Sequence, residues 1–279
     1  PDMQPPQNEY LDSLHIERFE RFEDILDALP KFFAAYKPAV YSEKQEEAGN
    51  VLENEALRDQ FLVVMLNKLL VKRLESSWSA FHSTLKAVHL VHQTTLSAVE
   101  QYATHKEDSL LRNDLNLIAQ EEETLDIPIG KREIRLSEID TAGNFETFKA
   151  HLEDDVQQLE SLIATLDHYD SRITKEQDQC SADAKLDRLM GLLNEQLDSS
   201  KPPEKRRLLL FTSYTDTANY LFDQLRHRGY KNMACISGDG ARSSDSPHTL
   251  VKNFEPVLER FCPFTKLYME RDWPEFEAK

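Results

Sequence analysis

Apolar residues recur every three or four positions over most of the first two thirds of this chain. Between residues 53 and 105 they form one continuous stripe, made of Leu66, Leu70, Leu74, Trp78, Phe81, Leu85 and Val88. Because an α-helix has 3.6 residues per turn, this spacing predicts one long helix with a single buried face. Residues 11–29 and 145–163 repeat the pattern, and helix is expected to continue with breaks to Leu197. The sequence therefore predicts a helical region over residues 1–197.

The helical pattern ends at a segment rich in proline and serine, Asp198-Ser199-Ser200-Lys201-Pro202-Pro203. Proline cannot continue a helix, and small polar residues are typical of connections between domains. We therefore predict a linker over residues 198–206 and a second region over residues 207–279.

A different pattern begins after the linker. The apolar run Arg207–Thr212 predicts a strand, and Thr217–Arg228 predicts a helix that Gly229 ends. A second strand is predicted over Asn232–Ser237, and this order of elements is typical of a parallel βαβ unit. A further helix is predicted to begin at Pro247. The predicted fold class is mainly α with a partial α/β end of two or three parallel strands.

The composition narrows the classes of function. The chain has 279 residues and a net charge of −17, so phosphates are repelled at long range and broad non-specific binding to nucleic acid is not expected. No apolar run reaches the roughly 18 residues of a membrane-spanning helix, so we expect no membrane partner. The three cysteines lie far apart without a C-x-x-C pair. This favours a reducing, cytoplasmic location over a disulfide framework or a zinc site.

Motifs for nucleotide hydrolysis are absent from the sequence. A phosphate-binding P-loop needs G-x-x-x-x-G-K-[ST], and the Gly-Lys pair at Gly130-Lys131 lacks both the partner glycine and the following hydroxyl residue. Sequences of the types D-E-x-[HD], H-E-x-x-H and G-x-S-x-G, which would bind a metal or activate a serine, are missing as well. We therefore expect no catalytic residue, no metal and no cofactor in this chain itself.

Two other patterns could carry chemistry. Cys235 follows a predicted strand and precedes Arg242, as in the C-x5-R cradle of cysteine phosphatases, but here six residues separate the pair and one of them is acidic. A cysteine in the core of a strand explains this pattern better. His82, His89 and His92 share a helical face, yet no cysteine or carboxylate stands at a convincing ligand spacing. For these histidines we expect a role in helix packing or solvation.

Two short segments are candidates for binding phosphates. The turn Thr212-Ser213-Tyr214-Thr215 places hydroxyls and backbone N–H groups at the carboxyl edge of the predicted sheet, where α/β proteins bind phosphates. Ordinary strand-end turn and N-cap chemistry is the alternative role for Ser213 and Thr215. Lys72 and Arg73 are adjacent cations on an otherwise apolar helix. They either extend to solvent and pair with a nearby carboxylate, or contact an oxyanion, for which arginine is well suited.

The segment Leu69–Leu85 reads Leu-Leu-Val-Lys-Arg-Leu-Glu-Ser-Ser-Trp-Ser-Ala-Phe-His-Ser-Thr-Leu. It resembles, close to residue for residue, a signature of bacterial Swi/Snf-type (RapA-like) superfamily II ATP-dependent helicases. Leu210–Thr217 is similar to the fourth helicase motif of that family, and Ile236-Ser237-Gly238 to the next strand of its second lobe. Ala35–Tyr41 and Ile129–Asn144 look like the family's upstream helical region and the loop that follows the signature.

The resemblance implies an ATP-driven motor that moves along nucleic acid, here double-stranded DNA, by means of two RecA-like lobes. Thr212, Ser213, Tyr214 and Thr215 would then contact the nucleic-acid backbone, and Lys72 and Arg73 would lie near the lobe interface or the nucleic-acid path. ATP and Mg²⁺ are implied for the parent protein, because the family's nucleotide motifs precede the matched region and its arginine-finger motif follows it. The chain is then an internal fragment, inactive alone, with a helical interlobe region and an incomplete RecA-like second lobe. Its partners would be nucleic acid and the remainder of the helicase chain.

A second class of function fits the same sequence. An acidic helical scaffold that binds protein partners would also have long amphipathic helices and a net charge of −17. The full reading frame distinguishes the two classes. P-loop and arginine-finger motifs on either side of this segment would favour the motor, and their absence would favour the scaffold.

Overall fold

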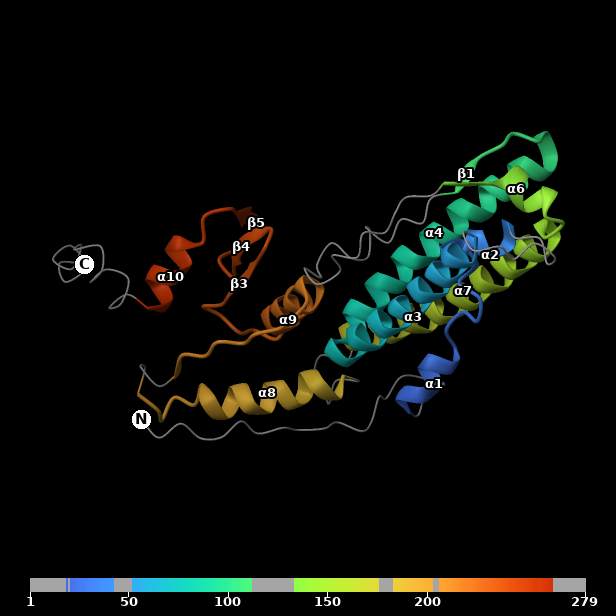
Figure 1. The fold of residues 1–279 in the computed structure, drawn as a ribbon. Helices are drawn as coiled ribbons and strands as arrows, with labels where there is room; N and C mark the ends of the chain where they lie inside the picture. The colour runs from blue at the N-terminus through green and yellow to red at the C-terminus, as the bar shows by residue number, and fades with distance from the viewer. Residues whose placement is uncertain are drawn as a thin grey trace. The chain divides into compact units, whose positions relative to one another are not determined.

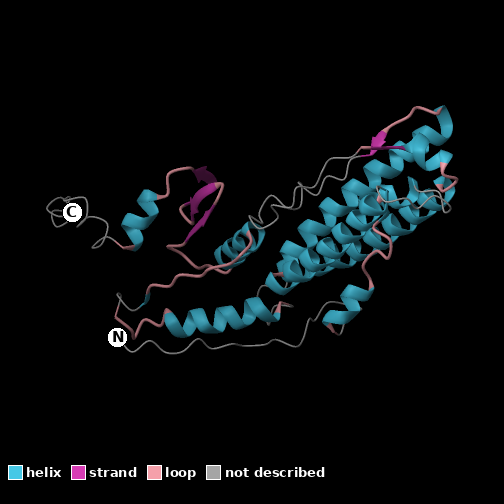
Figure 2. Ribbon diagram, in the orientation of Figure 1, coloured by secondary structure: helices cyan, strands magenta, loops and turns pink. Residues whose placement is uncertain are grey.

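The computed structural model describes residues 19, 21–42, 52–111, 133–175, 183–202 and 206–262. Within these residues the protein is mainly helical, with two small antiparallel sheets (Figure 2). The chain divides into two compact units, a first unit, Pro1–Ala184, and a second unit, Lys185–Lys279. None of the described helices is both long and apolar enough to cross a membrane. The prediction of a mainly α protein is confirmed.

Three long helices form the body of the first unit: α3 (Leu52–Ser76), α4 (Trp78–His105) and α7 (Phe145–Lys175). They lie side by side, with α4 packed against both of the others (Figure 1). α4 and α7 run in opposite directions, because His82 and His92 of α4 lie opposite Asp167 and Asp155 of α7. The buried apolar positions of α7 recur every three or four residues, as predicted: Phe145, Phe148, Leu152, Val156 and Leu159.

The single helix predicted over residues 53–105 is wrong, since the chain forms two helices here. Ser77, the one residue between α3 and α4, has an extended backbone, and its Oγ accepts a hydrogen bond from the Ala80 N–H at 3.1 Å. A serine in this position satisfies an N–H group that has no partner within the first turn, so a new helix begins. All seven residues of the predicted stripe are buried, and they stabilise a helical hairpin of α3 and α4.

Residues 30–42 form a strap that packs against all three long helices. The strap contains the 3₁₀-helix η1 (Ala34–Tyr36) and the short helix α2 (Pro38–Ser42), and it follows α1 (Phe22–Asp27). Phe33 has a left-handed backbone (φ 47°), and its ring is buried together with that of Tyr36. Of the helix predicted over residues 11–29, only α1 is helical within the described residues, and residues 11–18 and 20 lie outside them.

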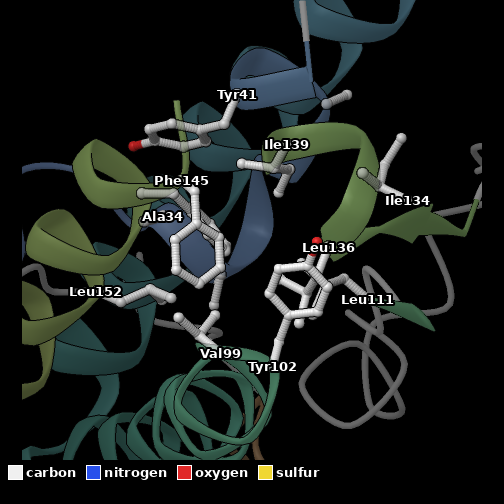
Figure 3. Packing of buried hydrophobic residues seen from close by; sticks show 13 residues of the cluster. Ala34, Tyr41, Val99, Tyr102, Leu111, Ile134, Leu136, Ile139, Phe145 and Leu152 are labelled. Atoms are coloured by element: carbon white, nitrogen blue, oxygen red, sulfur yellow. The ribbon is translucent and has the colours of Figure 1, made fainter. Parts of the chain in front are cut away.

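The strap covers a hydrophobic cluster to which elements far apart in the sequence contribute (Figure 3). Two of these elements form a short antiparallel ladder, β1 (Leu110–Leu111) and β2 (Ile134–Arg135), and α6 (Leu136–Thr141) follows directly. The side chains that meet are Tyr41 of the strap, Val99 and Tyr102 of α4, Leu136 and Ile139 of α6, and Phe145 and Leu152 of α7. Burial of each large apolar side chain in this cluster contributes about 1.5–3 kcal/mol to the free energy of folding.

Backbone N–H groups of the strap are satisfied by carboxylates from the long helices. The Phe32 and Ala34 N–H groups donate to the two carboxylate oxygens of Asp155 in α7, at 3.1 and 2.7 Å. The Ala39 N–H, in the first turn of α2, donates to Asp59 of α3 at 2.9 Å. Both carboxylates are buried. Short helices leave their first N–H groups without intrahelical partners, so these two aspartates are what allows the strap to be buried.

Asp140 of α6 joins α6 to the end of α4. Its Oδ2 accepts hydrogen bonds from the Lys106 ammonium group at 3.0 Å and from the Tyr102 hydroxyl at 2.9 Å. The bond from Lys106, followed by the bond from Tyr102, lowers the pKa of the Asp140 carboxyl below its ordinary range. The ionised carboxylate is therefore the form that the folded state favours.

Replacing Asp140 with asparagine should lower the melting temperature slightly at pH 7. A carboxyl whose pKa is lowered on folding stabilises the protein above its unfolded pKa of about 3.9. That contribution is lost as the pH falls through the lower folded-state pKa. Thermal unfolding of the wild type and the Asp140→Asn variant should therefore converge as the pH is lowered from 7 to about 2. A difference that stays constant over this range would contradict the role of the charge.

The second unit contains three helices and one three-stranded sheet among its described residues. The helices are α8 (Ala184–Gln196), which begins at the unit boundary, α9 (Thr215–His227) and α10 (Glu255–Phe261). The strands are β3 (Ala234–Ser237), β4 (Gly240–Ser243) and β5 (Ser246–Val251). They lie in the order β3-β4-β5, neighbouring strands are antiparallel, and α9 packs against β3.

The predicted parallel βαβ unit is only partly correct. α9 and β3 are present, and Gly229 follows α9 with the left-handed backbone (φ 86°) expected of a helix stop. Residues 207–212 form no strand, however, and the helix predicted from Pro247 is wrong, because β5 occupies that position. β3 pairs with β4 across the two-residue turn Gly238-Asp239, and closing so short a loop costs less entropy than closing a parallel crossover.

Two parts of the predicted second region and linker cannot be compared with the structure. Residues 203–205 of the predicted linker and residues 263–279 of the predicted second region lie outside the described residues. Residues 198–202 of the linker are mostly exposed and contain a turn in which the Lys201 N–H donates to the Asp198 carbonyl oxygen.

Candidate nucleic-acid interface

The predicted phosphate-binding turn lies at the start of α9. Thr212 and Ser213 are exposed, and Thr215 is the first residue of the helix. Tyr214 stands at the N-cap with an extended backbone and a buried side chain. The Thr212 hydroxyl lies 3.5 Å from the Tyr214 N–H, at the limit of a hydrogen bond. The turn therefore exposes two hydroxyls immediately before the first N–H groups of a helix.

The amphipathic pattern of α9 explains how the turn is held. Thr217, Tyr220, Phe222 and Leu225 are buried, so one face of the helix packs inward and the Tyr214 ring is buried beside its start. A helix N-terminus attracts anions through its N–H groups and the helix dipole. Asp216 in the first turn opposes this attraction with its negative charge. A phosphate contact here would therefore depend mainly on the hydroxyls and the backbone.

Lys72 and Arg73, the other two predicted contacts, lie in α3 of the first unit. Lys72 is exposed, whereas Arg73 is buried, with 4% of its surface accessible. Successive residues on a helix point about 100° apart, so one cation of the pair faces solvent while the other faces the core. Lys72 is therefore the member of this pair that is placed to contact a phosphate.

An apolar segment lies next to the hydroxyl turn. Leu208, Leu209, Leu210 and Phe211 expose 42%, 62%, 50% and 86% of their surfaces, although all four are strongly apolar. They take no part in the β3-β4-β5 sheet. A run of consecutive apolar residues such as this one is typical of a β-strand whose sheet is covered on both faces. Exposed apolar segments of this kind mark surfaces that bind another part of a protein.

The phosphatase-like pattern does not form an anion cradle. Cys235 and Arg242 are opposite each other on the antiparallel strands β3 and β4. The Arg242 guanidinium donates to both carboxylate oxygens of Asp223, at 3.2 and 3.3 Å, and lies over the Phe222 ring. Burial raises the pKa of the Cys235 thiol, so the reactive thiolate is disfavoured. The interpretation of Cys235 as a core residue of a strand fits this geometry.

The three histidines on one face of α4 each lie opposite a carboxylate of α7. His82 Nε2 is 3.1 Å from Asp167, His89 Nε2 is 3.4 Å from Glu160, and the fully buried His92 Nε2 is 3.5 Å from Asp155. Among the described residues, no group of three His, Cys, Asp or Glu side chains is arranged to bind a metal ion. Their contacts with carboxylates of the neighbouring helix fit the expected role in helix packing.

Three aspartates with polar contacts to other elements were not predicted from the sequence: Asp155, Asp59 and Asp223. Each is an acidic residue on an amphipathic helix, where acidic residues usually face solvent. The acceptor positions of Asp155 and Asp59 lie on the buried side of their helices. An acidic residue at a position where the helical spacing predicts a buried apolar residue is therefore the one sequence signal that could have identified Asp155 and Asp59.

Comparison with known proteins finds no matching family model, no matching curated protein and no matching solved structure. What the chain does is therefore inferred from its own residues and their arrangement.

Proposed function

We propose that this chain is part of an ATP-dependent nucleic-acid helicase or translocase. Its first unit would be the helical region that couples the motor lobes, and its second unit would be the beginning of an incomplete RecA-like second lobe. ATP and Mg²⁺ would act in the remainder of the parent protein, because the sequence of this chain lacks a P-loop and the acidic magnesium motif. The chain alone would be inactive.

The observation that carries the proposal is the exposed segment Leu208–Phe211 directly before the hydroxyl turn. In a motor lobe this segment would be a central strand, covered by helices on both faces and flanked by further strands. Its exposure is explained if the rest of the lobe supplies that cover. A scaffold made only of amphipathic helices gives no reason for four consecutive exposed apolar residues.

The residues of the Swi/Snf-like signature support a mechanical role. Leu70, Leu74, Phe81 and Leu85 are all buried in the α3–α4 hairpin. They would keep the hairpin rigid. A movement of one motor lobe would then displace the other lobe instead of bending the helices. The exposed Lys72 would contact phosphate or the neighbouring lobe.

The test uses the protein encoded by the whole reading frame. ATP hydrolysis should increase when double-stranded DNA is added, and the 279-residue chain alone should not hydrolyse ATP. Replacing Thr212 and Ser213 together with alanine should raise the DNA concentration for half-maximal stimulation by about tenfold, because two hydrogen bonds to phosphate are lost. Ser199 and Ser200 are also exposed turn hydroxyls, and their double alanine variant is the matched control.

Three results would contradict the proposal. One is a reading frame without P-loop and arginine-finger motifs, and another is ATP hydrolysis that does not respond to nucleic acid. The third is an equal loss of stimulation in the Ser199/Ser200 control, since these hydroxyls lie away from the start of α9 in the sequence.

The alternative proposal is an acidic scaffold for basic protein partners. Glu146, Glu153, Glu160 and Asp167 recur every seven residues along α7, and all four are exposed. Three of them already face basic or imidazole groups of the first unit, namely Lys149, His89 and Lys86. This pairing reduces the charge available to a partner, so the motor is the better supported proposal.

A further inference from the structure

His92 of α4 is completely buried, and an oxygen atom faces each of its ring nitrogens. Its Nδ1 forms a hydrogen bond with the Val88 carbonyl oxygen at 2.9 Å, whereas its Nε2 lies 3.5 Å from Oδ2 of Asp155, within ion-pair distance but without a hydrogen bond. The side chain of Asp155 is completely buried as well. A carbonyl oxygen and a carboxylate oxygen can only accept hydrogen bonds. The surroundings of this ring therefore suit an imidazole that carries a proton on both nitrogens.

A neutral imidazole carries only one N–H group and cannot satisfy both acceptors. One of its nitrogens would then direct a lone pair at an oxygen, inside a region that excludes water. An imidazolium also balances the negative charge of Asp155, which would otherwise be buried with two backbone N–H groups as its main compensation. Geometry and charge point to the same protonation state.

The proton on His92 is connected to the strap through a single carboxylate. Asp155 accepts hydrogen bonds from the Phe32 and Ala34 N–H groups of the strap, and Ala34 shares the oxygen that faces His92. The rings of Phe33 and Tyr36 lie edge-on to the imidazole, with centroids at 6.2 and 5.5 Å. Loss of the proton would therefore weaken the contacts that hold residues 32–36 on α4 and α7.

We propose that His92 is a proton-binding site that controls how firmly the strap is held on the α4–α7 pair. With the proton bound, the His92–Asp155 pair is neutral overall and the strap is closed. Without it, Asp155 is a buried charge beside an imidazole lone pair, and the strap opens more often. This device is independent of the proposed function and would act in either class of protein.

Other titratable groups lie on the strap, on α7 and on α3. In the strap, burial lowers the pKa of the Lys37 ammonium group while the charge of Asp155 raises it, and burial raises the pKa of the Tyr41 hydroxyl. On α7, His151 has its Nδ1 2.8 Å from the Tyr41 hydroxyl and stacks on Phe32. On α3, the carboxylate of Asp59 accepts from Ala39.

The remaining imidazole–carboxylate pairs of the α4–α7 interface differ from His92 in their exposure. Asp167 and Glu160, which face His82 and His89, expose 54% and 55% of their side chains. Solvent screens such pairs, so their protonation changes the interface little. His89 therefore provides a matched control on the same helix.

The direct test is ¹⁵N NMR of histidine-labelled protein between pH 5.5 and 8.5, combined with hydrogen exchange of the Phe32 and Ala34 amides. Both ring nitrogens of His92 should be protonated at pH 6, and the two amides should be at least about tenfold better protected at pH 6 than at pH 8.5, after correction for intrinsic exchange. In the His92→Gln variant this pH dependence should disappear, whereas the His89→Gln variant should retain it.

Two results would overturn the proposal. The first is a His92 ring with only one protonated nitrogen throughout the pH range, which the wild-type spectrum shows even if the His92→Gln variant does not fold. The second is protection of the Phe32 and Ala34 amides that does not follow the protonation of His92.

Discussion

Replacing Asp155 with alanine is expected to lower the free energy of unfolding of the first unit by about 3–5 kcal/mol. The side chain is completely buried and accepts hydrogen bonds from two N–H groups of the strap. Its removal leaves both N–H groups without their acceptor, and unsatisfied buried donors carry the full cost of desolvation. Denaturant unfolding followed by far-ultraviolet circular dichroism measures the loss, because the first unit is mainly helical.

Glu153 provides the control for this variant. It lies two residues before Asp155 on α7, exposes 53% of its side chain and forms an ion pair with Lys149 at 3.8 Å along the same helix. Such pairs contribute about 0.3–0.5 kcal/mol, so Glu153→Ala should be nearly neutral. If the two alanine variants lost the same stability, the carboxylate of Asp155 would not be what holds the strap.

Replacing Gly240 with alanine is expected to destabilise the second unit by about 1–3 kcal/mol from backbone strain alone. Gly240 begins β4 with a φ of +142°, which L-residues rarely adopt. An added Cβ would also lie 2.7 Å from the Val251 carbonyl oxygen in β5, and backbone atoms of a paired strand cannot move aside cheaply. Hydrogen exchange of the β3 and β4 amides should therefore accelerate, while exchange in α4 should not change.

Gly238 is the matched control for Gly240, because it lies in the same hairpin and a Cβ there would meet no atom within 4 Å. Gly238→Ala should leave the exchange of β3 nearly unchanged. This comparison also tests the sheet topology. In the parallel arrangement predicted from the sequence, both glycines would lie between the strand that ends at Ser237 and the helix that begins at Pro247, and both substitutions should then be tolerated alike.

The helices of the first unit were largely predictable because their signals are local. The spacing of Phe145, Phe148 and Leu152 specifies one buried face of α7 without reference to any other segment. The break at Ser77 was missed, although a serine N-cap is also a local signal, because apolar spacing of three and four continues across it. Periodicity alone does not distinguish one straight helix from a hairpin of two helices when the apolar spacing is the same on both sides of the turn.

The position of the candidate phosphate-binding turn before a helix was predicted correctly, but the strand predicted to precede the turn is absent. Thr212 and Ser213 do precede a helix, as the change from apolar to hydroxyl residues indicated. Whether the preceding residues Leu208–Phe211 form a strand depends on an available sheet edge, and β-structure is determined by its neighbours more than by its own composition. Helix packing likewise determines that Lys72 is exposed and Arg73 is buried.

The sequence by itself determined where most helices form and which of their faces are apolar, because 3.6-residue periodicity, helix caps and helix stops act within a few residues. Only the tertiary structure decided that Asp155 is buried, that His92 lies opposite it, and that the strap is held there. Phe32 and Asp155 are 123 residues apart in the chain, and contacts over such distances leave no local pattern. The antiparallel sheet was decided in the same way, because strand pairing is a property of two segments and a sequence pattern describes only one.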